Sequence, residues 1–115
     1  MFEIDENTQN IRITRGDSGI AESELYIGDG DDAVLYEMQD GDVISLGVKA
    51  DYEDAECIFQ KDVHENPAVF EFVPSDTKDL EFGTYYYDVQ FVRGSDGFTV
   101  TYIEKKKFKI TEEVV

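Results

Sequence analysis

Apolar and polar residues alternate at every second position in most hydrophobic segments of the chain. Successive side chains of a β-strand point to opposite faces, so this period of two predicts strands rather than helices. The longest alternating segment runs from 84 to 93, and one of its faces is expected to lie in the core. That face consists of Tyr85, Tyr87, Val89 and Phe91.

Turn signals rich in Gly and Asp separate the alternating segments at intervals of roughly 8–12 residues. A hairpin is expected in which residues 25–27 lead into a loop at 28–32 and residues 33–38 return. About seven to eight antiparallel strands with this spacing are typical of a β-sandwich. The other strands are expected at 11–14, 44–48, 55–59, 69–73, 98–103 and 108–110.

The segment 74–80 differs from its surroundings, because a proline followed by capping residues predicts a single helical turn. Ser75 or Asp76 is expected to cap the exposed amide groups, and Leu80 to reach the core. No segment is long enough for the helices of an α/β sheet. The 115 residues, 41% of them hydrophobic, fit one globular domain covering 1–115, since no linker or repeat divides them.

Charge is the most unusual bulk property, with 27 acids against 10 bases and a formal net charge of −17. This balance disfavours nucleic acid and anionic membranes, because their phosphates would be repelled. Residues 1–60 carry 16 of the acids and only 3 of the bases. An acidic surface with one basic corner would dock head to tail on its own copies. That corner is expected at Lys105, Lys106, Lys107 and Lys109.

Catalytic residues are not apparent, and we expect no enzyme activity and no cofactor. The single histidine, His64, lies in a polar stretch that predicts an exposed loop. Neither Cys57 nor any serine occurs in a nucleophile-elbow pattern, and zinc would need more His or Cys than the chain has. A lone cysteine fits a reducing compartment, and the N-terminus lacks the features of a secretory signal, so a complete intracellular product is expected.

Two short motifs have both a functional and a structural interpretation. The loop at 28–32, Gly-Asp-Gly-Asp-Asp, offers oxygen ligands for calcium, but it lacks the acid spacing and closing Glu of an EF-hand. A hairpin turn is the favoured interpretation. The tripeptide at 15–17, Arg-Gly-Asp, is read by some adhesion receptors, yet it lies where a strand must turn, and the turn is again favoured.

Tyr86 is the main candidate for an interface residue, since it lies on the polar face of its strand beside Asp88 and Gln90. The alternative is that a loop or the tail covers this second face. The lysines at 105–109 either contact an anionic partner or are solvated strand ends that protect a sheet edge from unwanted pairing.

A resemblance is carried by the opening strand together with Arg15-Gly16-Asp17, 75–80, 83–89, 94–97 and 107–114. These segments resemble those of small structural proteins of tailed bacteriophages and prophages, found in tails and baseplates. The resemblance covers roughly the last 45 residues well and the first 60 poorly, apart from the opening strand. It implies an immunoglobulin-like β-sandwich that assembles with other phage proteins or with itself, in the bacterial cytoplasm or the virion, without enzyme activity.

Two other classes of function stay open. The negative charge of the first 60 residues is compatible with a DNA mimic that inhibits a nucleic-acid-binding enzyme by presenting carboxylates at phosphate-like spacing. A β-sandwich with surface tyrosines also suits a carbohydrate-binding or adhesive module, although the chain has no Trp.

Overall fold

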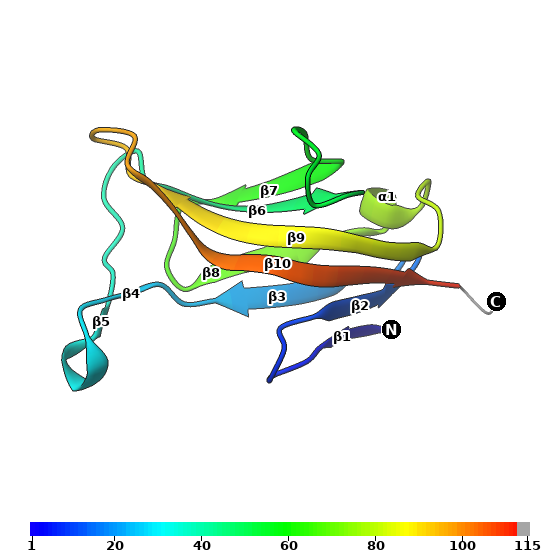
Figure 1. The fold of residues 1–115 in the computed structure, drawn as a ribbon, viewed down its shortest axis with the longest axis horizontal. Helices are drawn as coiled ribbons and strands as arrows, with labels where there is room; N and C mark the ends of the chain where they lie inside the picture. Colours follow the sequence, from blue (N-terminus) through cyan, green and yellow to red (C-terminus); the bar gives the residue numbers. More distant parts are fainter. Residues whose placement is uncertain (113–115) are drawn as a thin grey trace.

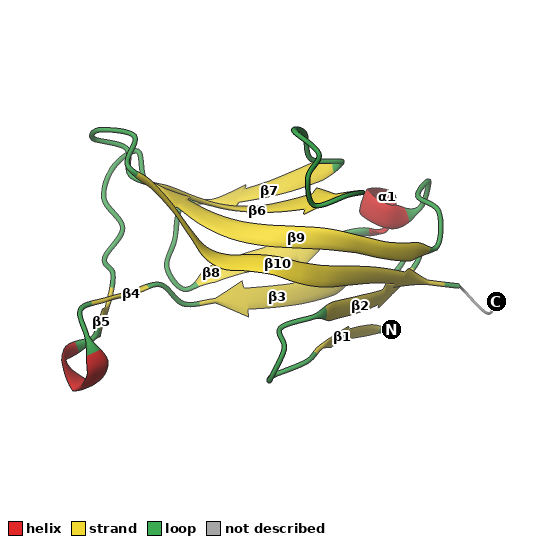
Figure 2. Cartoon of the chain, viewed as in Figure 1, coloured by secondary structure: helices red, strands yellow, loops and turns green. Residues whose placement is uncertain are grey.

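The computed structural model describes residues 1–112, and most of its regular structure is β-strand (Figures 1 and 2). This confirms an all-β class. The helical elements are the 3-10 turn η1 (Gly30–Asp32) and the short helix α1 (Pro74–Thr77). The strands are β1 (Phe2–Ile4), β2 (Ile11–Thr14), β3 (Gly19–Ser23), β4 (Tyr26–Ile27), β5 (Val34–Leu35), β6 (Val43–Lys49), β7 (Phe59–Val63), β8 (Ala68–Phe72), β9 (Gly83–Val92) and β10 (Thr99–Thr111).

Six strands form the main sheet, in the order β1-β2-β10-β9-β6-β7. Neighbouring strands are antiparallel except β2 and β10, which are parallel, with Ile11 opposite Phe108 and Ile13 opposite Ile110. The expectation of antiparallel strands throughout is therefore wrong at this pair. Strands joined by a short turn must be antiparallel, but these two lie almost a full chain apart, so no turn restricts their direction.

A second sheet pairs β3 with β8, and the main sheet curls over it (Figure 1). The two edge strands of the main sheet approach this pair, since β1 contacts β3 and β7 contacts β8. The core lies between the two sheets. Its buried apolar residues are Ile11, Ile13, Ala21, Ile44, Leu46, Val48, Ala68, Phe70, Phe72, Tyr87, Val89, Phe91, Phe108 and Ile110.

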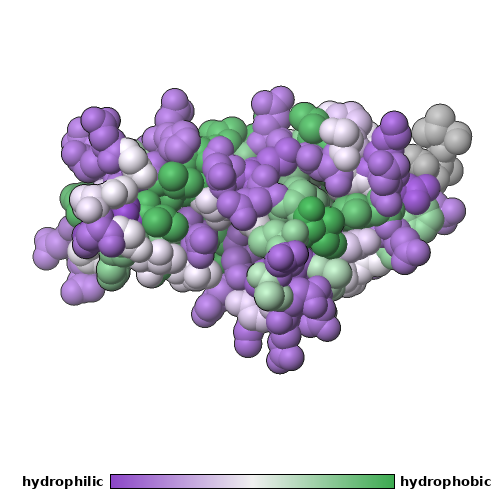
Figure 3. All heavy atoms as spheres, turned by 90° about the horizontal axis from the view of Figure 1, so that it is seen from above, coloured by the Kyte–Doolittle hydropathy of each residue, from purple (hydrophilic) through white to green (hydrophobic). Residues whose placement is uncertain are grey.

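The alternation in the sequence matches the buried face of β6, β8 and β9, and in β6 the buried apolar residues are Ile44, Leu46 and Val48. In β8 the buried residues alternate with exposed ones, and in β9 Tyr87, Val89 and Phe91 are buried while Tyr85 is half-buried. Phe72 joins the two sheets, because its ring contacts those of Phe59 and Phe108 at centroid distances of 6.2 and 5.5 Å. On the surface seen in Figure 3, hydrophilic side chains predominate and apolar ones appear in separate patches.

Helix α1 closes one end of the core, as the single helical turn predicted there. The Asp76 carboxylate accepts the backbone N–H of Val73 at 2.8 Å, and its other contact is an ion pair with Lys61 at 2.7 Å. Thr77 is fully buried and accepts the backbone N–H of Gly16 at 2.8 Å. Leu80 is half-buried and packs against the core, as expected.

Asp42 holds the opposite end of the core together. Its buried carboxylate accepts the Tyr36 hydroxyl at 2.7 Å and the backbone N–H groups of Gln39 and Gly94 at 2.8 Å each. These hydrogen bonds hold the pKa of Asp42 below its ordinary value, and the one from Tyr36 has the largest effect. One side chain thus joins the segment that follows β5 to the turn between β9 and β10.

Strand β10 differs most from expectation. Residues 98–103 and 108–110 were expected as separate strands, but a single strand covers 99–111 and is longer than β9. Its pairing with β9 shifts register between Thr101 and Ile103 and again between Ile103 and Lys106. Such bulges interrupt the alternation of side chains while the ladder continues, so the pattern gives the impression of two strands.

Two further expectations were wrong, the first in position and the second in length, since β7 has the expected five residues but is shifted by four. The strand expected at 55–59 begins only at Phe59, because residues 50–58 form a loop across the outer side of the main sheet. A Cβ at Gly47 would lie 2.6 Å from the Cys57 Sγ, so this glycine makes room for the loop.

The hairpin expected at 25–38 exists, but its two strands are only two residues long each. The sequence ends in a short tail with two acids, Glu112 and Glu113, and this tail lies outside the described residues from 113 onward.

Candidate interaction surface

The outer side of the main sheet carries an unusual concentration of cations. Side chains of this side alternate with the buried ones, so they point away from β3 and β8. Five of the ten Lys and Arg residues of the chain lie here, on β2, β6 and β10. We call this surface the basic face, and it consists of Arg12, Lys49, Lys105, Lys107 and Lys109.

Tyr86 lies in the middle of the basic face. It is half-buried, and in the sheet it stands opposite Lys107 on β10 and Lys49 on β6. With Tyr52 and Lys105 it lines an open hollow of about 570 Å³. Residues of the 50–58 loop line the same hollow, and Tyr86 stays partly accessible there, so its role at an interface stays a prediction.

Tyr52 extends the aromatic surface from the 50–58 loop. The ammonium groups of Lys105 and Lys49 lie 5.2 and 5.9 Å from its ring centroid, within the range of cation–π attraction. Burial raises the pKa of Tyr52, and the negative charges of Asp88 and Glu104 raise it further. Like any tyrosine, it is protonated at neutral pH, and its hydroxyl faces the Asp88 carboxylate as a hydrogen-bond donor.

The backbone positions Lys105 through a bulge. Its backbone φ of +57° is uncommon for a residue other than glycine. Its N–H donates to the Asp88 carboxylate at 3.0 Å. The Asp88 carboxylate therefore accepts a hydrogen bond from a backbone N–H that the bulge leaves without a partner in the β9–β10 ladder. The consequence is that Lys105 and Lys107 lie on the same side of the sheet as Tyr86.

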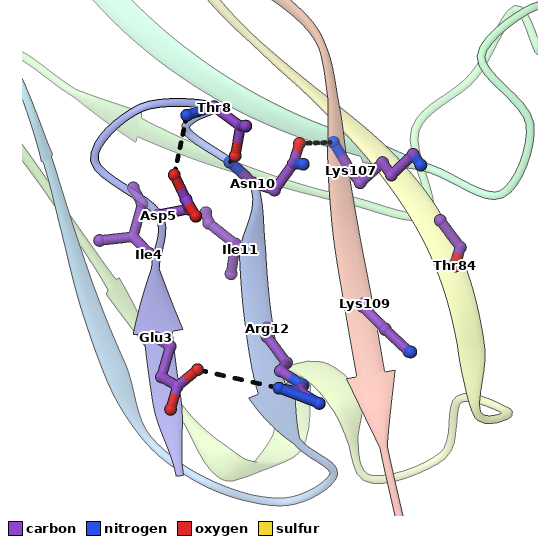
Figure 4. A pocket seen from close by; sticks show the side chains of 10 residues that line it. All are labelled: Glu3, Ile4, Asp5, Thr8, Asn10, Ile11, Arg12, Thr84, Lys107 and Lys109. Atoms are coloured by element: carbon purple, nitrogen blue, oxygen red, sulfur yellow. Dashed lines mark hydrogen bonds and ion pairs between the residues drawn. The ribbon is translucent and has the colours of Figure 1, made fainter.

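A second open hollow, of about 560 Å³, lies between β1, β2 and β10 (Figure 4). Lys107, Lys109 and Arg12 line it, and Lys109 stands directly opposite Arg12 in the parallel ladder. Glu3 is the nearest counter-charge, since one of its oxygens lies 3.9 Å from the Arg12 guanidinium. Three cations against two acids, Glu3 and Asp5, leave this hollow with a net positive charge that favours the binding of carboxylates.

The rim of this hollow is rigidly built by the β1–β2 turn. The Asp5 carboxylate accepts the backbone N–H groups of Asn7 and Thr8 at 2.8 and 2.9 Å. The hydrogen bond from Thr8 has the largest effect and that from Asn7 the next largest, and both lower the pKa of Asp5. Asn10 then accepts the backbone N–H of Lys107 at 3.0 Å, which fixes the turn against β10.

The structure separates the five residues predicted as interface candidates. Tyr86, Lys105, Lys107 and Lys109 lie together on the outer side of the main sheet, whereas Lys106 stands opposite Tyr87 and is half-buried on the inner side. The lysines are also not at a strand end or a sheet edge, since β10 is an interior strand.

Sequence reasoning missed Arg12, Lys49 and Tyr52 as members of this surface. The first two had a usable signal, since Arg12 alternates with buried isoleucines and Lys49 follows directly after Val48. Their nearness to the lysines depends on strand order, which the pattern does not reveal. Tyr52 lies in a segment that was expected to lead into a strand.

The predicted exposed loop at His64 is confirmed, and its Nδ1 lies 3.1 Å from the backbone carbonyl of Asp42. Cys57 is half-buried over Gly47. Within residues 1–112, no three His, Cys, Asp or Glu side chains come together as metal ligands would. The acidic loop at 28–32 contains the turn η1.

The Arg15-Gly16-Asp17 segment forms the turn predicted between β2 and β3, where Gly16 has a φ of +82°. Its two charged side chains have partners within the chain. The Arg15 guanidinium lies 4.2 Å from the ring centroid of Phe82, and Asp17 pairs with the N-terminal amino group.

No protein-family model matches the chain, and comparisons with curated proteins and with solved structures find no similar protein. In the part of the chain that the structure describes, no helix has the length and apolar composition needed to cross a membrane.

Proposed function

We propose that this protein is a non-enzymatic assembly domain that binds acidic protein surfaces, including those of its own copies, through the basic face. One observation carries the proposal: a chain with a net charge of −17 places half of its cations on one side of one sheet. Two tyrosines, Tyr52 and Tyr86, lie among them. Tyrosine and arginine are enriched at interface centres, and the lysines around them provide charge complementarity to an acidic partner.

We also propose that the two sheets form an immunoglobulin-like sandwich. Three features support this: β3 pairs with β8, β10-β9-β6 are neighbours in the other sheet, and the Tyr85 hydroxyl donates to the backbone carbonyl of Glu81 at 2.7 Å. The first two match the strand neighbours B–E and G–F–C of that fold, and the third matches its tyrosine corner at the start of strand F.

The assembly role is also what the resemblance to phage tail and baseplate proteins implies. We therefore propose a phage or prophage particle, or the cytoplasm of the bacterial host, as its location. Genes for tail or baseplate proteins beside this gene would support that context, and a neighbourhood of metabolic genes would argue against it.

A DNA mimic is the second candidate, and one observation favours it. Residues 16–48 contain nine carboxylates and not one Lys or Arg. A mimic would inhibit a basic nucleic-acid-binding enzyme and would be competed away by duplex DNA. The cations of the basic face favour the assembly role instead, because they would repel such an enzyme.

Sedimentation velocity of the full chain from micromolar to millimolar concentration tests the proposal. We expect the wild type to self-associate and Lys107→Glu/Lys109→Glu to weaken the association constant at least about tenfold. The control is Lys78→Glu/Lys106→Glu, which has the same charge but leaves the basic face intact. A wild type that stays monomeric throughout, or an equal effect of both variants, would overturn the proposal.

A further inference from the structure

The β4–β5 hairpin projects from the body of the molecule at the end opposite the termini (Figure 1). We call residues 26–35 the arm. Its four large apolar side chains are between 41% and 57% exposed. Tyr26 pairs with Leu35 and Ile27 with Val34, so one apolar pair lies on each side of the ribbon. Within residues 1–112, neither side of the arm is covered.

The arm is firmly held at its base. The Asn66 side chain accepts the backbone N–H of Leu25 at 3.0 Å and donates to the carbonyls of Leu25 and Tyr36 at 2.9 and 2.7 Å. The Tyr36 ring packs edge-on against Phe91 at a centroid distance of 5.1 Å. A two-stranded ribbon is only marginally stable alone, so a fixed base and an uncovered apolar tip indicate an element that a partner covers.

The charge of the arm defines the chemistry of that partner. Its tip carries Asp29, Asp31 and Asp32, all exposed, and the chain has no Lys or Arg between Arg15 and Lys49. The surface that receives the arm must therefore provide several cations beside some apolar area.

The hollow between β1, β2 and β10 has both properties. Arg12, Lys107 and Lys109 supply three cations against the two acids Glu3 and Asp5, so the hollow has a net positive charge, and the exposed Ile4 supplies apolar area (Figure 4). We propose that the arm of one copy docks in this hollow of a second copy. The inference rests on the proposed assembly function and specifies both halves of the contact.

This contact joins two different surfaces of the same chain. The arm lies at one end of the 47 Å long axis, and β1 and β2 lie toward the other end, beside the termini (Figure 1). A contact between unlike surfaces leaves one arm and one hollow free in every assembly, unless the rotation closes a ring. The expected products are a series of growing oligomers rather than a dimer alone.

Charge reversal of each half provides the test. The arm variant is Asp29→Lys/Asp31→Lys/Asp32→Lys, and the face variant is Arg12→Glu/Lys107→Glu/Lys109→Glu. Each has like charges on its arm and its hollow, so we expect each alone to associate at least about tenfold more weakly than the wild type. Mixed in equal amounts, they should associate again, because every contact then joins opposite charges.

The matched control is Glu22→Lys/Glu65→Lys/Glu71→Lys, which makes the same change of charge as the arm variant at three exposed acids elsewhere and should associate as the wild type does. Thermal unfolding of each variant confirms that it folds. If the face variant dissociates, the arm variant associates as the wild type does and the mixture shows no recovery, the inference fails while the proposed function stands. If the wild type does not associate, both fail.

Discussion

Two of the three sheets in this chain are single antiparallel pairs, and they have opposite environments. The β3–β8 pair lies under the main sheet and buries residues of both strands, among them Ala21, Phe70 and Phe72. The β4–β5 pair makes the same kind of ladder, yet all four of its residues are exposed. The difference shows that backbone pairing sets local geometry, whereas burial of side chains provides most of the stability.

The largest expected effect tests the buried pair directly. Phe72→Ala should lower the free energy of unfolding by about 3–5 kcal/mol, because the ring is fully buried and joins both sheets. Urea denaturation measures it. Val69→Ala, on the exposed side of the same strand, is the control and should cost less than about 1 kcal/mol. Equal costs would mean that the core does not lie between the sheets.

Asp42 links the segment that follows the arm to the core, and it gives a pH-dependent effect. Because folding lowers the pKa of this carboxyl, its contribution to stability is present above the unfolded pKa and is lost as the pH falls through the folded value. Asp42→Asn should lower the melting temperature by on the order of 5–10 °C at pH 7.

The difference between wild type and Asp42→Asn should narrow as the pH falls below the ordinary value of 3.8. Melting curves from pH 7 to pH 3 measure this. Asp40→Asn, an exposed change in the same turn, is the control. A constant difference across that range would show that the charge of Asp42 is not what stabilises the turn.

A smaller effect concerns the hydrogen bond that ties β3 to the main sheet. The hydroxyls of Ser23 and Tyr102 lie 2.8 Å apart, and Ser23 is buried. Tyr102→Phe should cost about 0.5–1.5 kcal/mol in chemical denaturation, because the serine hydroxyl loses its partner. Adding Ser23→Ala should recover part of this loss, and no recovery would contradict the pairing.

The smallest expected effect is on the arm. Ile27→Ser/Val34→Ser should change the free energy of unfolding by less than about 0.5 kcal/mol, since both side chains are half exposed in the single chain. The same variant should weaken self-association measurably. A large loss of stability without any loss of association would mean that the arm packs on its own chain.

The sequence pattern predicts the core better than the surface, for a physical reason. Burial of one face imposes an alternation of apolar and polar residues that can be recognised within a single strand, and it correctly identifies Val89 and Phe91 of β9 as core residues. The basic face instead depends on which strands are neighbours, and the parallel pairing of Arg12 with Lys109 has no local signal. Lys106 was grouped with its neighbours in sequence, although the sheet turns it to the other side.

The parallel pairing of β2 with β10 also determines how the molecule responds to tension. If the two ends of the chain are pulled apart, β1 peels from β2 one hydrogen bond at a time, because the two strands are antiparallel. The load then reaches the β2–β10 ladder, where the four paired positions are stretched along the strand axes and must break together. The domain therefore extends slightly under low force and then resists until this ladder breaks.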